Sequence, residues 1–188
     1  MISFPDLTES GEDAYILTRF YDTLYVGEFP DPADRYSLAD LLDALRRKSA
    51  GDFGRDNRHV VLALLDGQVV GGASAVFLAE PNVAVLEFVV GADDWSFRQI
   101  LTRTENLLRA DAERLGRPLF AILAELTGVL PPGYRRLALD SSVMAAKPLR
   151  TDWVDALPST TVRAVVRART GADQLIRSST VDLVEFGA

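Results

Sequence analysis

The sequence predicts an α+β protein with a mixed, largely antiparallel sheet flanked by helices. Two amphipathic segments near the start of the chain have helical periodicity. Three apolar segments then follow one another as a strand meander, and a long amphipathic helix leads directly into another buried strand. No repeat or linker interrupts the chain, so we expect one domain over residues 1–188.

The first two helices have clear local signals. In residues 12–25, "EDAYILTRFYDTLY", apolar side chains recur every three or four positions. The second helix is expected to begin at Ser37, with Asp40 three residues later as its capping-box partner. A basic last turn followed by Gly51 predicts where this helix ends.

The meander is predicted from turn residues between apolar runs. Asp66 and Gly67 form the strongest two-residue hairpin signal. Gly71 and Gly72 indicate a bulge or a close approach of another backbone. The three strands are expected at residues 59–65, 68–78 and 81–90.

The second half begins with a long helix, expected from about Ser96 to Leu115, and a buried strand at residues 118–125 follows it. The pattern then weakens. The remaining expectations are a short helix at 134–137, strands at 141–149 and 160–169, and an edge strand at 179–188.

Composition excludes several classes of protein. The net charge of −7 argues against a nucleic-acid binder, and no apolar run is long enough to span a membrane. The amino terminus lacks the features of a secretory signal, so we expect a cytoplasmic protein. With no cysteine and with His59 as its one histidine, the chain is expected to bind no metal through cysteine or several histidines. His59 itself is interpreted as an edge or capping residue.

The order of these elements resembles the GNAT superfamily of acyl-CoA-dependent N-acetyltransferases over roughly Tyr15 to Arg169. The stretches "FPDPADRYSLADLLDAL", "DGQVVGG", "LEFVVGADD" and "YRRLAL" are similar to segments of one bacterial branch of that family. The resemblance implies a bulged fourth strand, here Val83–Val90, that splays from the fifth. The pantetheine arm of acetyl-CoA, or of another acyl-CoA, would lie in that gap against the backbone of Phe88, Val89 and Val90.

In the family, the donor's pyrophosphate sits on the next helix start, in a loop of the type R/Q-x-x-G-x-G/A. Laying this signature on the sequence places Ser96, Gln99 and Leu101 at its three defining positions, and all three depart from it. Ser96 and Gln99 instead fit a capping box, and Trp95 and Ile100 have the spacing of a hydrophobic staple.

The charges at this helix start also matter. Asp93 and Asp94 place two carboxylates where a pyrophosphate would lie, and at ~5 Å such charges repel by a few kcal/mol at an effective dielectric of about 20. Arg98 and Arg103 can reach a phosphate from the first turns, or they are solvated arginines. The cofactor-binding candidates here are Arg98, Gln99, Ile100 and Arg103.

The resemblance also supplies catalytic and substrate-binding candidates. Glu87 matches a carboxylate that deprotonates the attacking amine; its alternative role is an outward-facing residue or an ion pair. Tyr134 matches a tyrosine that protonates the departing thiolate, or it packs on the core. Tyr21, Tyr25 and Phe29 lie where relatives line the acceptor pocket, or they belong to the core and its rim.

The function implied is transfer of an acetyl or other acyl group from an acyl-CoA, or another thioester or ester donor, to a small-molecule amine. The alternative is a catalytically inactive module of the same fold that binds a metabolite or a protein partner. No nucleic-acid or membrane partner is expected, and homodimer formation is left open.

Overall fold

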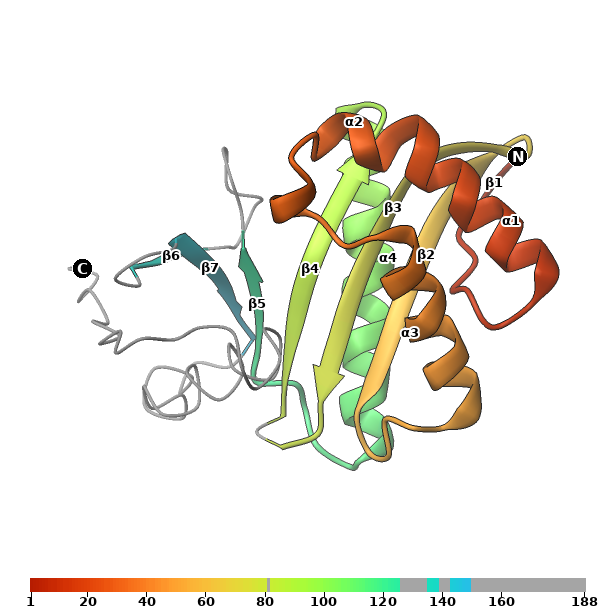
Figure 1. The fold of residues 1–188 in the computed structure, drawn as a ribbon. Helices are drawn as coiled ribbons and strands as arrows, with labels where there is room; N and C mark the ends of the chain where they lie inside the picture. The colour runs from red at the N-terminus through yellow and green to blue at the C-terminus, as the bar shows by residue number, and fades with distance from the viewer. Residues whose placement is uncertain (81, 126–134, 139–142, 150–188) are drawn as a thin grey trace.

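The computed structural model of the protein describes residues 1–80, 82–125, 135–138 and 143–149. Its strands form one seven-stranded sheet in the order β1-β2-β3-β4-β5-β7-β6 (Figure 1). The β4–β5 pair is parallel, and every other neighbouring pair is antiparallel. The predicted mixed sheet of an α+β fold is confirmed. The strands are β1 (Ile2–Ser3), β2 (Asn57–Leu65), β3 (Gln68–Leu78), β4 (Val83–Gly91), β5 (Ala121–Glu125), β6 (Arg135–Ala138) and β7 (Val143–Pro148).

Helices cover both faces of the sheet (Figure 1). One face carries the amino-terminal helices, which pack a cluster of aromatic and leucine side chains onto β2 and β4. The long helix α4 covers the opposite face and packs on β3, β4 and β5. The helices are α1 (Gly11–Phe20), the π-helix η1 (Tyr21–Tyr25), α2 (Val26–Glu28), the 3₁₀ turn η2 (Pro32–Asp34), α3 (Leu38–Ala50) and α4 (Asp94–Arg114).

The predicted local signals of α3 and the hairpin are confirmed. The Ser37 hydroxyl accepts from the Asp40 N–H at 3.1 Å, and the Asp40 carboxylate accepts from the Ser37 N–H at 3.0 Å. Gly51 ends α3 in the left-handed conformation. Asp66 and Gly67 both have positive φ, as a tight turn between β2 and β3 requires.

Glycines allow α1 and α4 to approach the sheet closely. A Cβ on Gly72 would lie 2.6 Å from a Leu62 methyl and 2.8 Å from the Phe20 ring. A Cβ on Gly91, at the end of β4, would lie 2.5 Å from the Phe97 nitrogen of α4. The predicted close approach of another backbone is confirmed at Gly71, where a Cβ would lie 2.5 Å from Val90 O, and a register shift of the β2–β3 ladder lies directly beside it. Gly72 is crowded by side chains, and Gly91 adds a second close backbone approach.

Two predictions about the helices were wrong. Helix α4 begins at Asp94, before the expected Ser96. The short helix expected at 134–137 is replaced over Arg135–Ala138 by β6, which pairs with β7. The strand expected at 141–149 is confirmed as β7, and the strands expected at 160–169 and 179–188 lie outside the described residues. Among the described residues, no helix is both long and apolar enough to cross a bilayer.

Replacing Gly91 with alanine is expected to destabilise the protein by about 1–3 kcal/mol, because backbone atoms of α4 would have to move. Urea unfolding measures the change. Gly27→Ala is the matched control: its Cβ would meet nothing within 4 Å, so the substitution is expected to be neutral or slightly stabilising. Equal stabilities of the two variants would contradict the close contact at Gly91.

Candidate functional site

The site lies where the described pairing of β4 with β5 ends. The two strands pair over Ala84↔Ile122, Val85↔Leu123 and Leu86↔Ala124, and the described pairing ends there. Strand β4 continues to Gly91 without a described β5 partner. We call the side of β4 from Glu87 to Gly91 that faces away from β3 the β4 slot.

A β-bulge lies directly at the start of this slot. In the β3–β4 ladder Ser74 pairs with Phe88 and Ala75 pairs with Leu86, so Glu87 is the extra residue. A bulge interrupts the strict alternation of side chains. Glu87 contacts Ser74 of β3, and Phe88 packs with the aromatic residues of the amino-terminal helices. The bulge that the resemblance implied for the fourth strand is therefore present.

The backbone of β4 has groups directed into the slot. The Ala92 N–H donates to Val70 O at 2.9 Å, which fixes the phase of the ladder. Hydrogen-bonded and non-hydrogen-bonded pairs alternate along antiparallel strands. The main-chain groups of Val90 therefore point toward β3, and those of Val89 and Gly91 point into the slot. Of the three predicted contacts with a pantetheine arm, the geometry best supports Val89.

Glu87 is a buried carboxylate held by three donors. Its Oε1 accepts from the Tyr36 hydroxyl at 3.0 Å, and its Oε2 accepts from the Ser74 hydroxyl at 2.6 Å. Arg58 forms an ion pair with the same Oε2. Only 3% of the Glu87 side chain is exposed, so any proton transfer to it from a ligand needs a small displacement or a bridging water. The ion-pair interpretation is confirmed, and the catalytic one stays a prediction.

The predicted acceptor-binding aromatics form one cluster beside Glu87. The Tyr25 ring lies 4.6 Å from the Phe88 ring and 5.1 Å from the Phe29 ring, centroid to centroid. Tyr25 is buried, its hydroxyl accepts from the Tyr36 N–H at 3.0 Å, and burial raises the pKa of Tyr25 to about 12. Tyr21 and Phe29 are partly exposed at the edge of the cluster. The π-helix that carries Tyr21 and Tyr25 is a rare feature, frequent at functional sites.

The start of α4 is capped by its own residues, although not by the predicted ones. Asp93 is the cap: its carboxylate accepts from the Ser96 N–H at 2.7 Å, and the Ser96 hydroxyl completes the capping box. The hydrogen bonds from Ser96 lower the pKa of Asp93, so this carboxyl is ionised at neutral pH. The box expected between Ser96 and Gln99 is wrong. Trp95 is half exposed in the first turn, so its expected role as a staple before the helix is also wrong.

The earlier start of α4 changes the surroundings of the predicted cofactor-binding residues on this helix. Arg98, Gln99 and Ile100 lie inside α4, where their N–H groups belong to the helical ladder. The Ile100 side chain is fully buried. Arg98 and Arg103 are exposed and form no ion pair with another described residue. Cofactor binding by these four residues stays a prediction without support from the geometry, and Tyr134 lies outside the described residues.

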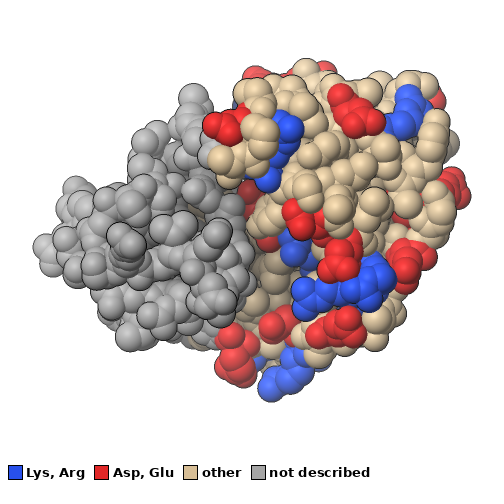
Figure 2. Space-filling view, in the orientation of Figure 1, with Lys and Arg blue, Asp and Glu red and all other residues tan. Residues whose placement is uncertain are grey.

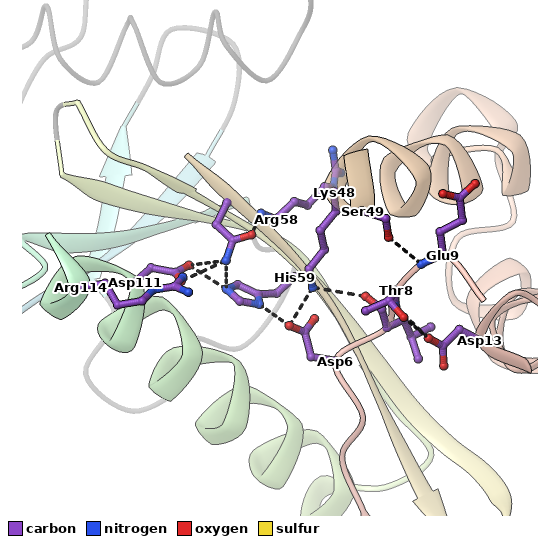
Figure 3. Close-up of polar contacts among 12 residues, drawn as sticks. Asp6, Thr8, Glu9, Asp13, Lys48, Ser49, Arg58, His59, Asp111 and Arg114 are labelled. Atoms are coloured by element: carbon purple, nitrogen blue, oxygen red, sulfur yellow. Dashed lines mark hydrogen bonds and ion pairs between the residues drawn. The ribbon is translucent and has the colours of Figure 1, made fainter. Parts of the chain in front are cut away.

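His59 occupies a buried polar cluster that sequence reasoning missed (Figure 3). Its Nδ1 lies 2.7 Å from Asp6 Oδ2 and its Nε2 lies 2.7 Å from Asp111 Oδ2. Each contact is a hydrogen bond only when that ring nitrogen carries the proton. Lys48 adds an ion pair to Asp6 at 2.8 Å. The cluster ties the amino-terminal segment, β2 and α4 together, so the interpretation of His59 as an edge or capping residue was wrong.

A cavity of about 390 Å³ lies beside this cluster, and Asp111 and Arg114 are part of its wall. Its other lining residues come from α3, from the segment leading into β2 and its first residue, from Phe77 of β3 and from the residue after α4. On the face shown in Figure 2, acidic and basic side chains of the described residues are interspersed, without a large patch of one sign.

Comparison with known proteins identifies the fold. No family model matches the chain, and no curated protein matches it by sequence. Solved structures do match. PaiA N-acetyltransferase from Thermoplasma acidophilum, in complex with coenzyme A, is 15% identical and aligns over 79% of this chain and 99% of its own, with a TM-score of 0.54. A proposed GNAT-family acetyltransferase from Desulfovibrio desulfuricans is 16% identical over 80% and 100% of the two chains, with a TM-score of 0.58.

A third match is N-acetylglutamate synthase from Neisseria gonorrhoeae, complexed with coenzyme A and N-acetylglutamate. It is 12% identical, and the alignment covers 80% of this chain and 35% of that one, with a TM-score of 0.55. Identities this low establish the architecture and not the reaction. The protein has the GNAT fold, with the bulged β4 and the parallel β4–β5 pair described above.

The His59 cluster gives a prediction for acid stability. Burial alone would raise the pKa of Asp6, but the interactions with His59 and Lys48 outweigh it, and the pKa lies below its ordinary value of 3.8. Asp6 therefore contributes stability above that value and loses the contribution as the pH falls through its lowered pKa.

Asp6→Asn is expected to lower the free energy of unfolding by about 1–3 kcal/mol near neutral pH, and by much less at about pH 2. Urea unfolding at both pH values measures this. The control Asp43→Asn removes an exposed carboxylate from α3 and is expected to change stability by about 0.5 kcal/mol or less. A loss for Asp6→Asn that is the same at both pH values would contradict the assignment.

Proposed function

We propose that the protein is a GNAT-type acyltransferase that moves an acetyl or other acyl group from a thioester donor to a small-molecule amine. The observation that carries this proposal is the bulge at Glu87, which directly follows the last described β4–β5 pair, Leu86↔Ala124. It places a buried carboxylate beside a slot with main-chain groups directed into it. Two of the structures with this fold are described as complexes with coenzyme A, which supports a thioester donor.

In this mechanism the donor lies along β4 and hydrogen-bonds to the main chain of Val89. The amine nitrogen attacks the thioester carbonyl carbon, and the amine proton passes to Glu87 directly or through a water molecule. The carbon–sulfur bond then breaks, and the thiolate leaves with a proton from an acid. Tyr134 is our candidate for that acid, on the resemblance alone.

The aromatic cluster would form the wall of the acceptor site. Tyr25 is buried and hydrogen-bonded through its hydroxyl, so its role would be to shape that wall. Tyr21 and Phe29 are partly exposed beside it and would contact the acceptor itself. A mostly apolar wall with Glu87 behind it would favour an amine presented on an apolar or aromatic group.

A specific observation favours the second candidate, a catalytically inactive module that binds a metabolite or a protein. Both oxygens of Glu87 already accept hydrogen bonds, and a base needs a lone pair within reach of the proton it removes. An activity assay separates the two candidates.

The assay measures thiol release from acetyl-CoA with a panel of small amines. The chain has no cysteine, so a thiol reagent reports only the released coenzyme A. Release above the enzyme-free rate for at least one amine is expected. Without turnover, acetyl-CoA at a hundredfold its Kd would still raise stability by about 2.7 kcal/mol. Binding without release would support the inactive module, and neither binding nor release would overturn the acyl-donor site.

Glu87→Gln is expected to lower kcat by about a hundredfold or more, because the amide cannot take the amine proton. Glu105→Gln is the matched control: Glu105 is also buried and paired, with Lys147 at 2.6 Å, but it lies on α4 outside the site. It is expected to lose stability and to keep kcat. If both variants lose activity in proportion to their lost stability, Glu87 acts through the fold and is not the base.

A further inference from the structure

The β4 slot leads directly to the start of α4. A donor with its thioester near Glu87 and its arm along β4 extends past Gly91, where the strand ends. Only Ala92 and Asp93 separate β4 from α4. The far end of a donor that continues in this direction therefore arrives at the first turn of α4.

The first turn of α4 has few free N–H donors for an anion. The first N–H groups of a helix lack intrahelical partners and commonly bind phosphates. Here the Ser96 N–H donates to the Asp93 carboxylate, and the Phe97 N–H donates to Asp93 O at 3.0 Å. The Trp95 N–H also interacts with the Asp93 carboxylate. The chain itself occupies the donors that a phosphate would need.

The charge at this position disfavours an anion as well. Asp93 is ionised, and Asp94 adds a second carboxylate in an exposed position. Arg98, four residues after Asp94 on α4, supplies one positive charge against these two carboxylates. A diphosphate at the helix start would meet net negative charge.

Close packing keeps the turn from opening into a loop. The backbone of Phe97 lies against Gly91 so tightly that no Cβ would fit between them. Ile100, one turn later, is fully buried against Gly71. Moving the helix start away from β4 would therefore break the packing of Phe97 on Gly91 and of Ile100 on Gly71.

We infer that the β4 slot recognises the pantetheine arm of the acyl donor and does not bind a nucleotide diphosphate. This inference rests on the proposed function. The ligand class is a pantetheine thioester, whether free or attached to coenzyme A or to a carrier protein. The main-chain groups of Val89 and Gly91 give the specificity for the pantetheine arm. The acidic start of α4 offers no binding site for the nucleotide end of the donor.

Isothermal titration of the full chain with pantetheine and with coenzyme A tests the inference, because neither titration needs the acceptor. The two Kd values are expected to agree within about threefold. The nucleotide half alone, adenosine 3′,5′-bisphosphate, is expected not to compete with pantetheine. Coenzyme A binding about thirtyfold or more tightly than pantetheine, or competition by the bisphosphate, would overturn the inference and leave the acyltransferase proposal standing. Binding of neither thiol would overturn both.

A charge variant gives a second test at the helix start. Asp93→Ser combined with Asp94→Asn removes both carboxylates and keeps a good capping residue. The affinity for pantetheine is expected to stay the same, and that for coenzyme A to stay the same or rise a few-fold. A loss of affinity for coenzyme A alone would show that these residues hold the nucleotide, and would overturn the inference. Asp43→Asn combined with Asp52→Asn, at exposed positions in and just after α3, is the matched control for net charge.

Acetyl-pantetheine and an acetylated carrier protein then distinguish the sources of the donor, with thiol release as the readout. A kcat/KM for acetyl-pantetheine within about threefold of that for acetyl-CoA supports the inference. A higher value for the carrier protein supports it too and identifies the carrier-bound thioester as the source. A value for acetyl-CoA about thirtyfold or more above both would overturn it.

Discussion

Opposite Ser74 and Ala75 of β3, strand β4 contains one extra residue, Glu87. A bulge bends its strand and increases the local twist. The last described pair of β4 with β5, Leu86↔Ala124, lies directly before this residue. The register of the sheet thus fixes where the carboxylate lies relative to both neighbouring strands.

The buried carboxylate also imposes a constraint on the amino-terminal half of the fold. A buried charge is tolerated only with good partners, and the three donors to Glu87 come from different parts of the chain. Tyr36 precedes α3, Arg58 belongs to β2 and Ser74 belongs to β3. Any ligand that uses Glu87 has to share it with these groups, so the packing of the helices and the chemistry of the slot are coupled.

Local patterns were sufficient for most elements of the fold, including the capping box of α3 and the hairpin turn. The start of α4 was placed wrongly because Asp93–Ser96 and Ser96–Gln99 both have capping-box spacing, and the packing of Phe97 on Gly91 favours the earlier one. The partners of His59 were not predictable, since Asp6 and Asp111 lie 53 and 52 residues away. The site residues came from a resemblance, and the structure adds the register of β4, the partners of Glu87 and the packing of the aromatic cluster.

The two-residue connection between β4 and α4 has a consequence for the evolution of this fold. Exchanging residues alone leaves Gly91 and Phe97 in contact, so a loop that exposes its N–H groups at this point needs the first turn of α4 to unwind. Under the proposed function, the short connection between β4 and α4 therefore limits the size of the group that can extend past Gly91 from the acyl thioester.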